Sequence, residues 1–304
     1  MPNNIDASNL HEYTLEALAN ADYALAQVEK LTIDEPHQLK DITTEWLQQV
    51  IVKSPSKAKL KHLDVEDEHD GMTSRKKWQL EWNAVGCNES LPDSIFVKAT
   101  TELPHHRETL ALLHMHELEA NFYRQIAPES PGLSPQAYYT AAYPGGRFLI
   151  VLEDLVNNGC TPYWIADHCG VEHARQVIIA LAKFHALYWQ SERLHRDLSW
   201  VRPRTRRFGW TWLRKSFTHA RNNFLAQASE DILPEDVAMV LRDWNQHAEQ
   251  VFDYWETKPQ TVLHGDSHVG NTYSKPDGKA GLFDWQVMFR GHGLRDVAYF
   301  YSRH

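Results

Sequence analysis

Residues 264–271 read His-Gly-Asp-Ser-His-Val-Gly-Asn, and residues 283–286 read Phe-Asp-Trp-Gln. A short apolar run that is typical of a strand leads into each stretch. The pattern therefore predicts a polar loop between two short strands, with Asp266 and Asn271 on the loop and Asp284 at the end of the second strand.

This order of side chains suits phosphoryl transfer. One carboxylate has to accept the proton of a hydroxyl group, while a second carboxylate and an amide oxygen hold Mg²⁺ against the nucleotide phosphates. Mg²⁺ is a hard cation that prefers oxygen ligands. Kinases carry an Asp, an Asn and a further Asp in the same order as Asp266, Asn271 and Asp284.

The two motifs resemble those of the aminoglycoside phosphotransferase and choline kinase superfamily, and more narrowly the bacterial ecdysteroid kinase-like phosphotransferases. The resemblance covers residues 55–300. It implies an α+β, two-lobed protein-kinase-like fold that binds ATP and Mg²⁺ and phosphorylates a small-molecule hydroxyl. Asp266 would be the catalytic base, and Asn271 and Asp284 would hold Mg²⁺.

The same resemblance assigns the residues that grip the nucleotide phosphates. Lys98, on a short predicted strand, would hold the α- and β-phosphates, and Glu119, on a predicted helix, would pair with it. Glu117 is a rival for that pairing. Thr73 and Ser74 belong to a predicted hairpin tip that resembles the phosphate-covering loop.

Two further segments resemble known parts of the superfamily. The stretch 152–155 resembles the hinge whose backbone pairs with adenine, which makes Glu153 and Leu155 candidate nucleotide contacts. The stretch 291–296 resembles the segment in which a buried aspartate, here Asp296, braces the catalytic loop.

Hydrophobic periodicity divides the chain into a sheet-rich first half and a mostly helical second half. We expect an N-lobe over 1–154, with N-terminal helices and the nucleotide-binding sheet, and a C-lobe over 155–304. The ranges expected to be helical are 12–31, 42–52, 107–125, 173–189 and most of 195–260.

Composition excludes several classes of protein. The chain of 304 residues is 42% hydrophobic and carries a net charge of −9, which argues against disorder and against general nucleic-acid binding. No apolar run is long enough to span a membrane, and no secretory signal is visible. Three cysteines fit a reducing, cytoplasmic setting. The oligomeric state is not indicated.

Two alternative functions stay open at this level. The 18 histidines and the pattern His264-x-Asp266-x-His268 could belong to a metal-dependent hydrolase. A kinase-like protein that binds nucleotide without catalysis is the other alternative.

The acceptor of the phosphoryl group is expected to be a small molecule, because no Ala-Pro-Glu segment follows Asp284. The many tryptophans of 195–260 favour an apolar acceptor. The resemblance also implies further helices beyond Phe300, so we expect the C-lobe to be short at its C-terminal end.

Overall fold

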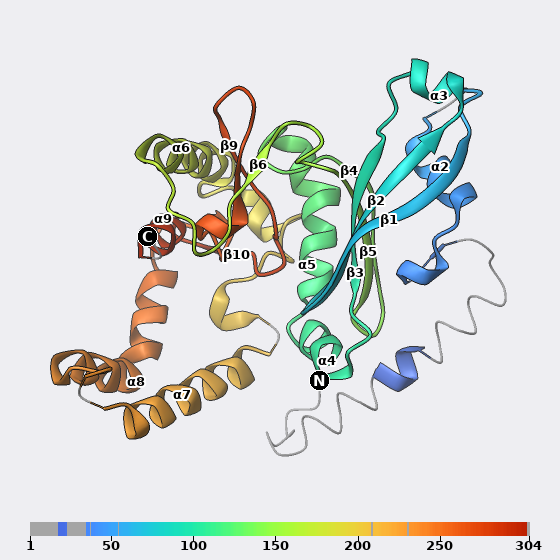
Figure 1. Ribbon diagram of the computed structural model, residues 1–304. Coiled ribbons are helices and arrows are strands. Elements are labelled where there is room, and N and C mark those ends of the chain that lie inside the picture. Colours follow the sequence, from blue (N-terminus) through green and yellow to red (C-terminus); the bar gives the residue numbers. More distant parts are fainter. Residues whose placement is uncertain are drawn as a thin grey trace.

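The computed structural model describes residues 18–22, 35–36, 38–53, 55–207, 209–229 and 231–302. It has an α+β fold in which a five-stranded antiparallel sheet is followed by a mostly helical part (Figure 1). This confirms the predicted fold class. Of the helix expected over 12–31, only 18–22 lie among the described residues, and these are helical.

The sheet has the strand order β1-β2-β3-β5-β4, and every neighbouring pair is antiparallel. The strands are β1 (Leu60–Asp70), β2 (Thr73–Trp82), β3 (Ser94–Thr100), β4 (Ala137–Tyr143) and β5 (Arg147–Glu153). The hairpin tip predicted near 70–74 joins β1 to β2. The sequence analysis omitted β4, whose residues are all half-buried and show no apolar–polar alternation.

The two-residue period of β3 decides which face each of its side chains occupies. Val97 and its alternate neighbours join the apolar cluster beneath α2 (Thr44–Ile51). Phe96 and Lys98 therefore point to the other face, where α5 (Met115–Asn121) covers the sheet. Figure 1 shows α2 and α5 on opposite sides of the sheet.

The prediction of a single helix over 107–125 is wrong. The chain forms α4 (Pro104–Leu112), then α5, and then a π-helical turn over Phe122–Ile126. His114 interrupts the helix because its φ of 53° lies in the left-handed region. Periodicity alone carries no signal for such a backbone break.

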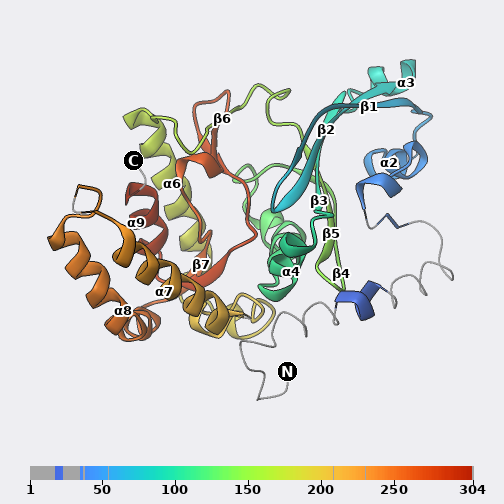
Figure 2. The same cartoon turned by 60° about the horizontal axis from the view of Figure 1, so that its bottom comes forward.

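Among the residues that the structure describes, the helical part contains four longer helices and several very short strands. The helices are α6 (Val171–Tyr188), α7 (Trp210–Gln227), α8 (Glu235–Glu256) and α9 (Leu294–Ser302). The strands are β6 (Thr161–Pro162), β7 (Thr261–Leu263), β8 (Thr272–Ser274), β9 (Ala280–Leu282) and β10 (Phe289–Gly291). A five-residue helix, α3 (Ala84–Asn88), follows β2. Figures 1 and 2 show α7 and α8 side by side, directed away from the sheet.

One hydrophobic cluster joins the sheet to the helical part. Trp285 is fully buried, and its ring stacks on that of Phe122 with 3.9 Å between centroids. Phe184 of α6 packs against the same indole at 5.1 Å. The residue after Asp284 is thus fixed in the common core. No helix among the described residues is both long and apolar enough to cross a bilayer.

Candidate active site

Asp296, in the first turn of α9, braces the loop over 264–271. Its Oδ2 accepts a hydrogen bond from the backbone N–H of His264 at 2.8 Å, and its Oδ1 accepts one from that of Gly265 at 2.9 Å. The Nε2 of His185 lies 3.0 Å from the same Oδ2. Both side chains are buried, so the loop is held by a carboxylate that solvent does not reach. The expected bracing role of Asp296 matches this geometry.

His264 links this loop to the segment that carries Asp284. Its Nδ1 accepts the backbone N–H of Asp266 at 3.2 Å, so its Nε2 carries the proton and donates to the carbonyl of Phe283 at 2.9 Å. Burial lowers the pKa of the His264 imidazole, which keeps the ring neutral as this arrangement requires. His264 is therefore a structural residue between two site-bearing segments.

Asp266 presents a partly exposed carboxylate at the centre of the loop. Its Oδ2 accepts a hydrogen bond from Asn271 Nδ2 at 3.1 Å and lies 3.5 Å from His268 Nε2. Burial raises the pKa of this carboxyl, but contacts with His268 and a hydrogen bond with Tyr299 outweigh that effect and lower the pKa to about 2. Asp266 is thus ionised at neutral pH.

Asn271 is oriented by its own amide nitrogen. Nδ2 donates to the Asp266 carbonyl at 2.8 Å as well as to the carboxylate. The Oδ1 atom accepts no hydrogen bond among the described residues, so it is available to a cation. Because Phe283 donates its N–H to the Asn271 carbonyl at 3.0 Å, Asn271 lies beside the segment that leads to Asp284.

Asp284 lies where the loop meets the sheet. Its φ of 66° is in the left-handed region, which is a costly conformation. The buried Trp285 on one side, and Phe283 with its two backbone hydrogen bonds on the other, hold Asp284 in it. The Asp284 carboxylate is 15% exposed, and its Oδ1 accepts a hydrogen bond from Lys98 Nζ at 2.8 Å. Such strained residues concentrate at functional sites.

Lys98 forms a second ion pair with Glu119 of α5, at 2.6 Å, and both side chains are almost fully buried. The rival Glu117 instead faces the Nδ1 of His114 at 2.9 Å. Burial raises the pKa of the Glu119 carboxyl, and Lys98 only partly offsets this. Although burial also acts on Asp284, Lys98 and Arg75 lower the pKa of that carboxyl. We call Lys98, Glu119 and Asp284 the interlobe cluster.

Arg75 is a site residue that the sequence analysis missed. It lies opposite Lys98 in the β2–β3 register, and its guanidinium is 3.6 Å from Asp284 Oδ2. Its Nε also donates to Thr73 Oγ1 at 3.2 Å. In the sequence, the only signal for Arg75 was its position two residues after Thr73. That position indicates a site residue only when the strand register, which sets Arg75 opposite Lys98, is known.

The other predicted nucleotide contacts lie on either side of this cluster. Thr73 and Ser74 are buried at the hairpin tip, where Ser74 donates to Asp70. The Glu153 side chain accepts hydrogen bonds from the Gln136 backbone and from the Asn158 amide, at 2.7 and 2.6 Å. Among the described residues, no hydrogen bond or ion pair joins Glu153 or Leu155 to the interlobe cluster.

The metal-hydrolase alternative does not fit this geometry. Both ring nitrogens of His264 already have hydrogen-bond partners within the protein. Among the described residues, no group of three or more His, Cys, Asp or Glu side chains is placed to hold a metal ion. The pattern His264-x-Asp266-x-His268 therefore does not form a three-ligand site.

Comparison with known proteins gives a family match. The model of the ecdysteroid kinase-like family matches residues 74–302. No curated protein sequence matches the chain. Among solved structures, LicA in complex with AMP is 11% identical, with a TM-score of 0.46, covering 86% of this chain and 72% of that one.

Two further solved structures are similar at the same low level. An aminoglycoside phosphotransferase from Streptomyces rimosus is 16% identical, with a TM-score of 0.42, covering 75% of this chain and 74% of that one. The ethanolamine kinase of Plasmodium vivax is 14% identical, with a TM-score of 0.44, covering 78% of this chain and 58% of that one.

Proposed function

The chain belongs to the ecdysteroid kinase-like family, and on that premise we propose that it transfers the γ-phosphoryl group of ATP to a hydroxyl of a small molecule. One observation carries the proposal. The buried Lys98 bridges Glu119 and Asp284, and Asp284 directly follows a segment hydrogen-bonded to the loop that presents the ionised Asp266. This arrangement supports the proposal, because phosphoryl transfer needs a phosphate-binding cation, cation ligands and a proton acceptor close together.

On the nucleotide side, Lys98 would bind the α- and β-phosphates while Glu119 holds its ammonium in place. The Glu119 side chain suits this role because it is buried and its nearest charge is Lys98 Nζ, 2.6 Å away. The backbone near Thr73 and Ser74 would cover the phosphates. The backbone of Glu153 and Leu155 would pair with adenine.

The donor set fits a hard divalent cation. Asn271 Oδ1 and the Asp284 carboxylate are oxygen ligands, and the hydrogen bonds of Asn271 Nδ2 leave that oxygen free. When bound, Mg²⁺ would neutralise the charge that develops on the β- and γ-phosphates. The protein's part is to hold these two oxygens on segments fixed by Phe283 and Trp285.

Asp266 would orient the acceptor hydroxyl and take its proton. The acceptor oxygen forms a bond to the γ-phosphorus, the bond from that phosphorus to the bridging oxygen breaks, and ADP leaves. With a pKa of about 2, Asp266 is a weak base toward a ground-state alcohol. Its main contribution is then positioning, and it receives the proton late, as the hydroxyl becomes acidic through bond formation.

The test combines binding and turnover. Calorimetry should show Mg²⁺-dependent ATP binding that Asp284→Asn weakens and Asp266→Asn leaves nearly unchanged. A panel of hydroxylated metabolites, including sterols and amino alcohols, should yield at least one phosphorylated product. ATP binding without transfer to any member of the panel would instead support the non-catalytic alternative. Zinc retained through purification, without Mg-ATP affinity, would contradict both.

A further inference from the structure

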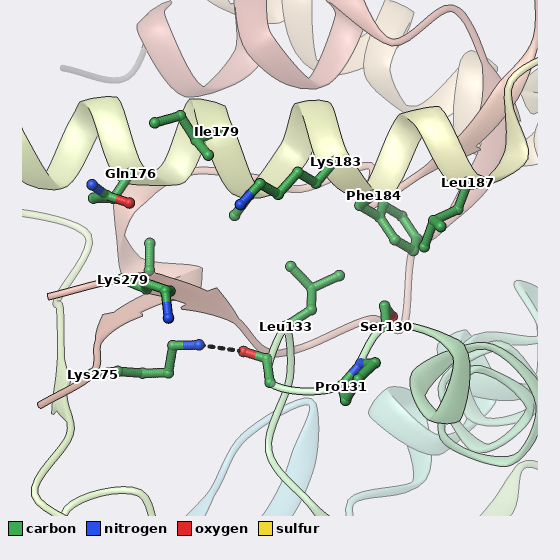
Figure 3. Close-up of a pocket in the computed structure, with 13 residues that line it drawn as sticks. Ser130, Pro131, Leu133, Gln176, Ile179, Lys183, Phe184, Leu187, Lys275 and Lys279 are labelled. Atoms are coloured by element: carbon green, nitrogen blue, oxygen red, sulfur yellow. Dashed lines mark hydrogen bonds between the residues drawn. The ribbon is translucent and has the colours of Figure 1, made fainter. Parts of the chain in front are cut away.

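A cavity of about 240 Å³ lies on the helical part, outside the interlobe cluster. It is formed by the turn over 130–133, helix α6 and the β8–β9 hairpin, as Figure 3 shows. None of the residues assigned to phosphoryl transfer lines it. The cavity therefore needs its own explanation.

Three lysines give the cavity a positive charge. Lys183, Lys275 and Lys279 all line the cavity, and Figure 3 shows Lys183 on α6 and Lys275 directed towards the turn over 130–133. Lys275 Nζ donates to the Gly132 carbonyl at 2.8 Å, and Lys279 pairs with Asp277 at 2.7 Å. Within the part of the chain that the structure describes, Lys183 has no hydrogen bond or ion pair, and no acidic residue lines the cavity. One cation is thus left for an anion from outside.

Apart from Ser130 and Gln176, the other side chains that line the cavity are apolar. They include Leu133, Ile179, Phe184 and Leu187. The volume lies just below the range of about 300–1,000 Å³ that is usual for drug-sized ligands. A short hydrocarbon chain or a single ring would fill it.

The cavity wall is hydrogen-bonded to the strand that leads to Asp284. The Leu133 carbonyl accepts the backbone N–H of Leu282 at 2.7 Å, and Leu282 ends the strand that leads to Asp284. On its other side, the turn over 130–133 continues from the helical turns that follow α5, which carries Glu119. A molecule that contacts Leu133 would therefore act on the segment that carries Asp284.

We propose that this cavity binds a small amphipathic organic anion, with its apolar body against Leu133 and Phe184 and its anionic group on Lys183. Binding alters the affinity for Mg-ATP through Leu133 and Leu282. The site goes beyond the proposed function, and its occupancy does not depend on whether the chain transfers phosphate.

Octanoate is a suitable probe, with octan-1-ol as the uncharged molecule of equal chain length. Calorimetric titration should show octanoate binding that Lys183→Gln weakens about fivefold, the scale of a partly exposed ion pair. Lys183→Arg should keep the affinity. Because Lys183 is exposed, these variants should fold normally.

A matched control comes from a second apolar groove on the same helix. That groove, of about 690 Å³, is lined by Arg175 together with Trp255 and Tyr301. Arg175→Gln should leave octanoate binding unchanged. Equal binding of octanol and octanoate, or a loss in Arg175→Gln but not in Lys183→Gln, would overturn the proposal.

The regulatory part has its own readout. Octanoate should shift the dissociation constant of Mg-ATP in the wild type, and Lys183→Gln should need about fivefold more octanoate to reach the same shift. If octanoate binds without any such shift, the proposed binding site stands, but the proposed effect on Mg-ATP affinity through Leu133 is wrong. Both measurements use binding alone, so their failure is distinguishable from failure of the phosphotransferase proposal.

Discussion

The interlobe cluster and the α7–α8 pair are held in opposite ways. In the interlobe cluster all three charged side chains are buried or nearly so, and each has an oppositely charged partner. Helices α7 and α8, which lie wholly within the described residues, bury only Ala238. Paired charges in a low-dielectric interior tolerate few alternative arrangements, whereas exposed surfaces tolerate many. The arrangement of the interlobe cluster is therefore specific enough to support a proposed chemistry, whereas the exposed faces of α7 and α8 do not indicate which acceptor binds.

The largest expected effect is on turnover. Asp266→Asn should lower kcat by roughly 10²–10⁴-fold, the usual contribution of a positioned proton acceptor. The dissociation constant of Mg-ATP should change little, since Lys98 and Asp284 are untouched. Steady-state kinetics with the identified acceptor, and calorimetry with Mg-ATP, measure the two quantities. A turnover loss equally large in Phe217→Ser, on the exposed face of α7, would erase the contrast between the regions.

Removal of the cluster's central cation should also cost stability. Lys98→Met leaves Glu119 and Asp284 buried without their common partner, so the free energy of unfolding should fall by about 3–5 kcal/mol. Urea denaturation followed by circular dichroism would measure this. The double variant Lys98→Met/Glu119→Gln should recover part of the loss, because it removes one of the unpaired charges. A double variant less stable than Lys98→Met would contradict the electrostatic explanation.

Acid should destabilise the side of the molecule that holds the interlobe cluster. Burial lowers the pKa of His116, on α5, to about 4 from its ordinary value of 6.5. The unfolded chain therefore binds the proton first, so stability is complete above pH 6.5 and falls as the pH drops to 4. The expected loss is roughly 3 kcal/mol. Denaturation at several pH values measures it, and His116→Gln should flatten the profile.

His247 provides the matched control for the His116 substitution. It lies exposed on α8, so His247→Gln should change the free energy of unfolding by no more than about 0.5 kcal/mol. An equal change in both histidine variants would show that burial does not distinguish the two regions.

The smallest effect is expected on the α7–α8 pair. Phe217→Ser and Met239→Ser replace side chains that are more than half exposed, so each should change the free energy of unfolding by no more than about 0.5 kcal/mol. If this face contacts the acceptor, the same variants should raise the KM for the acceptor while kcat stays constant. Thermal denaturation and kinetics would check the two statements.

The sequence predicted those site residues that lie close together along the chain. Asp266 and Asn271 lie on one loop, and Asp284 follows the next strand pair, so their spacing alone indicated their proximity. The choice of Glu119 over Glu117 required the helix phase after the left-handed His114, which no periodicity shows.

Other features depended on contacts between distant segments. Arg75 lies at the site because the β2–β3 register sets it opposite Lys98. The strand β4 was missed because its residues show no apolar–polar alternation. The lysine-lined cavity joins three segments far apart in the chain, so no local pattern could have indicated it.

The most direct test of the central claim is product analysis after incubation with ATP, Mg²⁺ and the acceptor panel. Mass spectrometry and a coupled ADP assay would be run on the wild type and Asp266→Asn in parallel. We predict one phosphate ester per ADP released by the wild type, and a rate lower by at least about a hundredfold in the variant. An ester formed at an undiminished rate by Asp266→Asn, or bound Mg-ATP with no ester from any alcohol, would contradict the account.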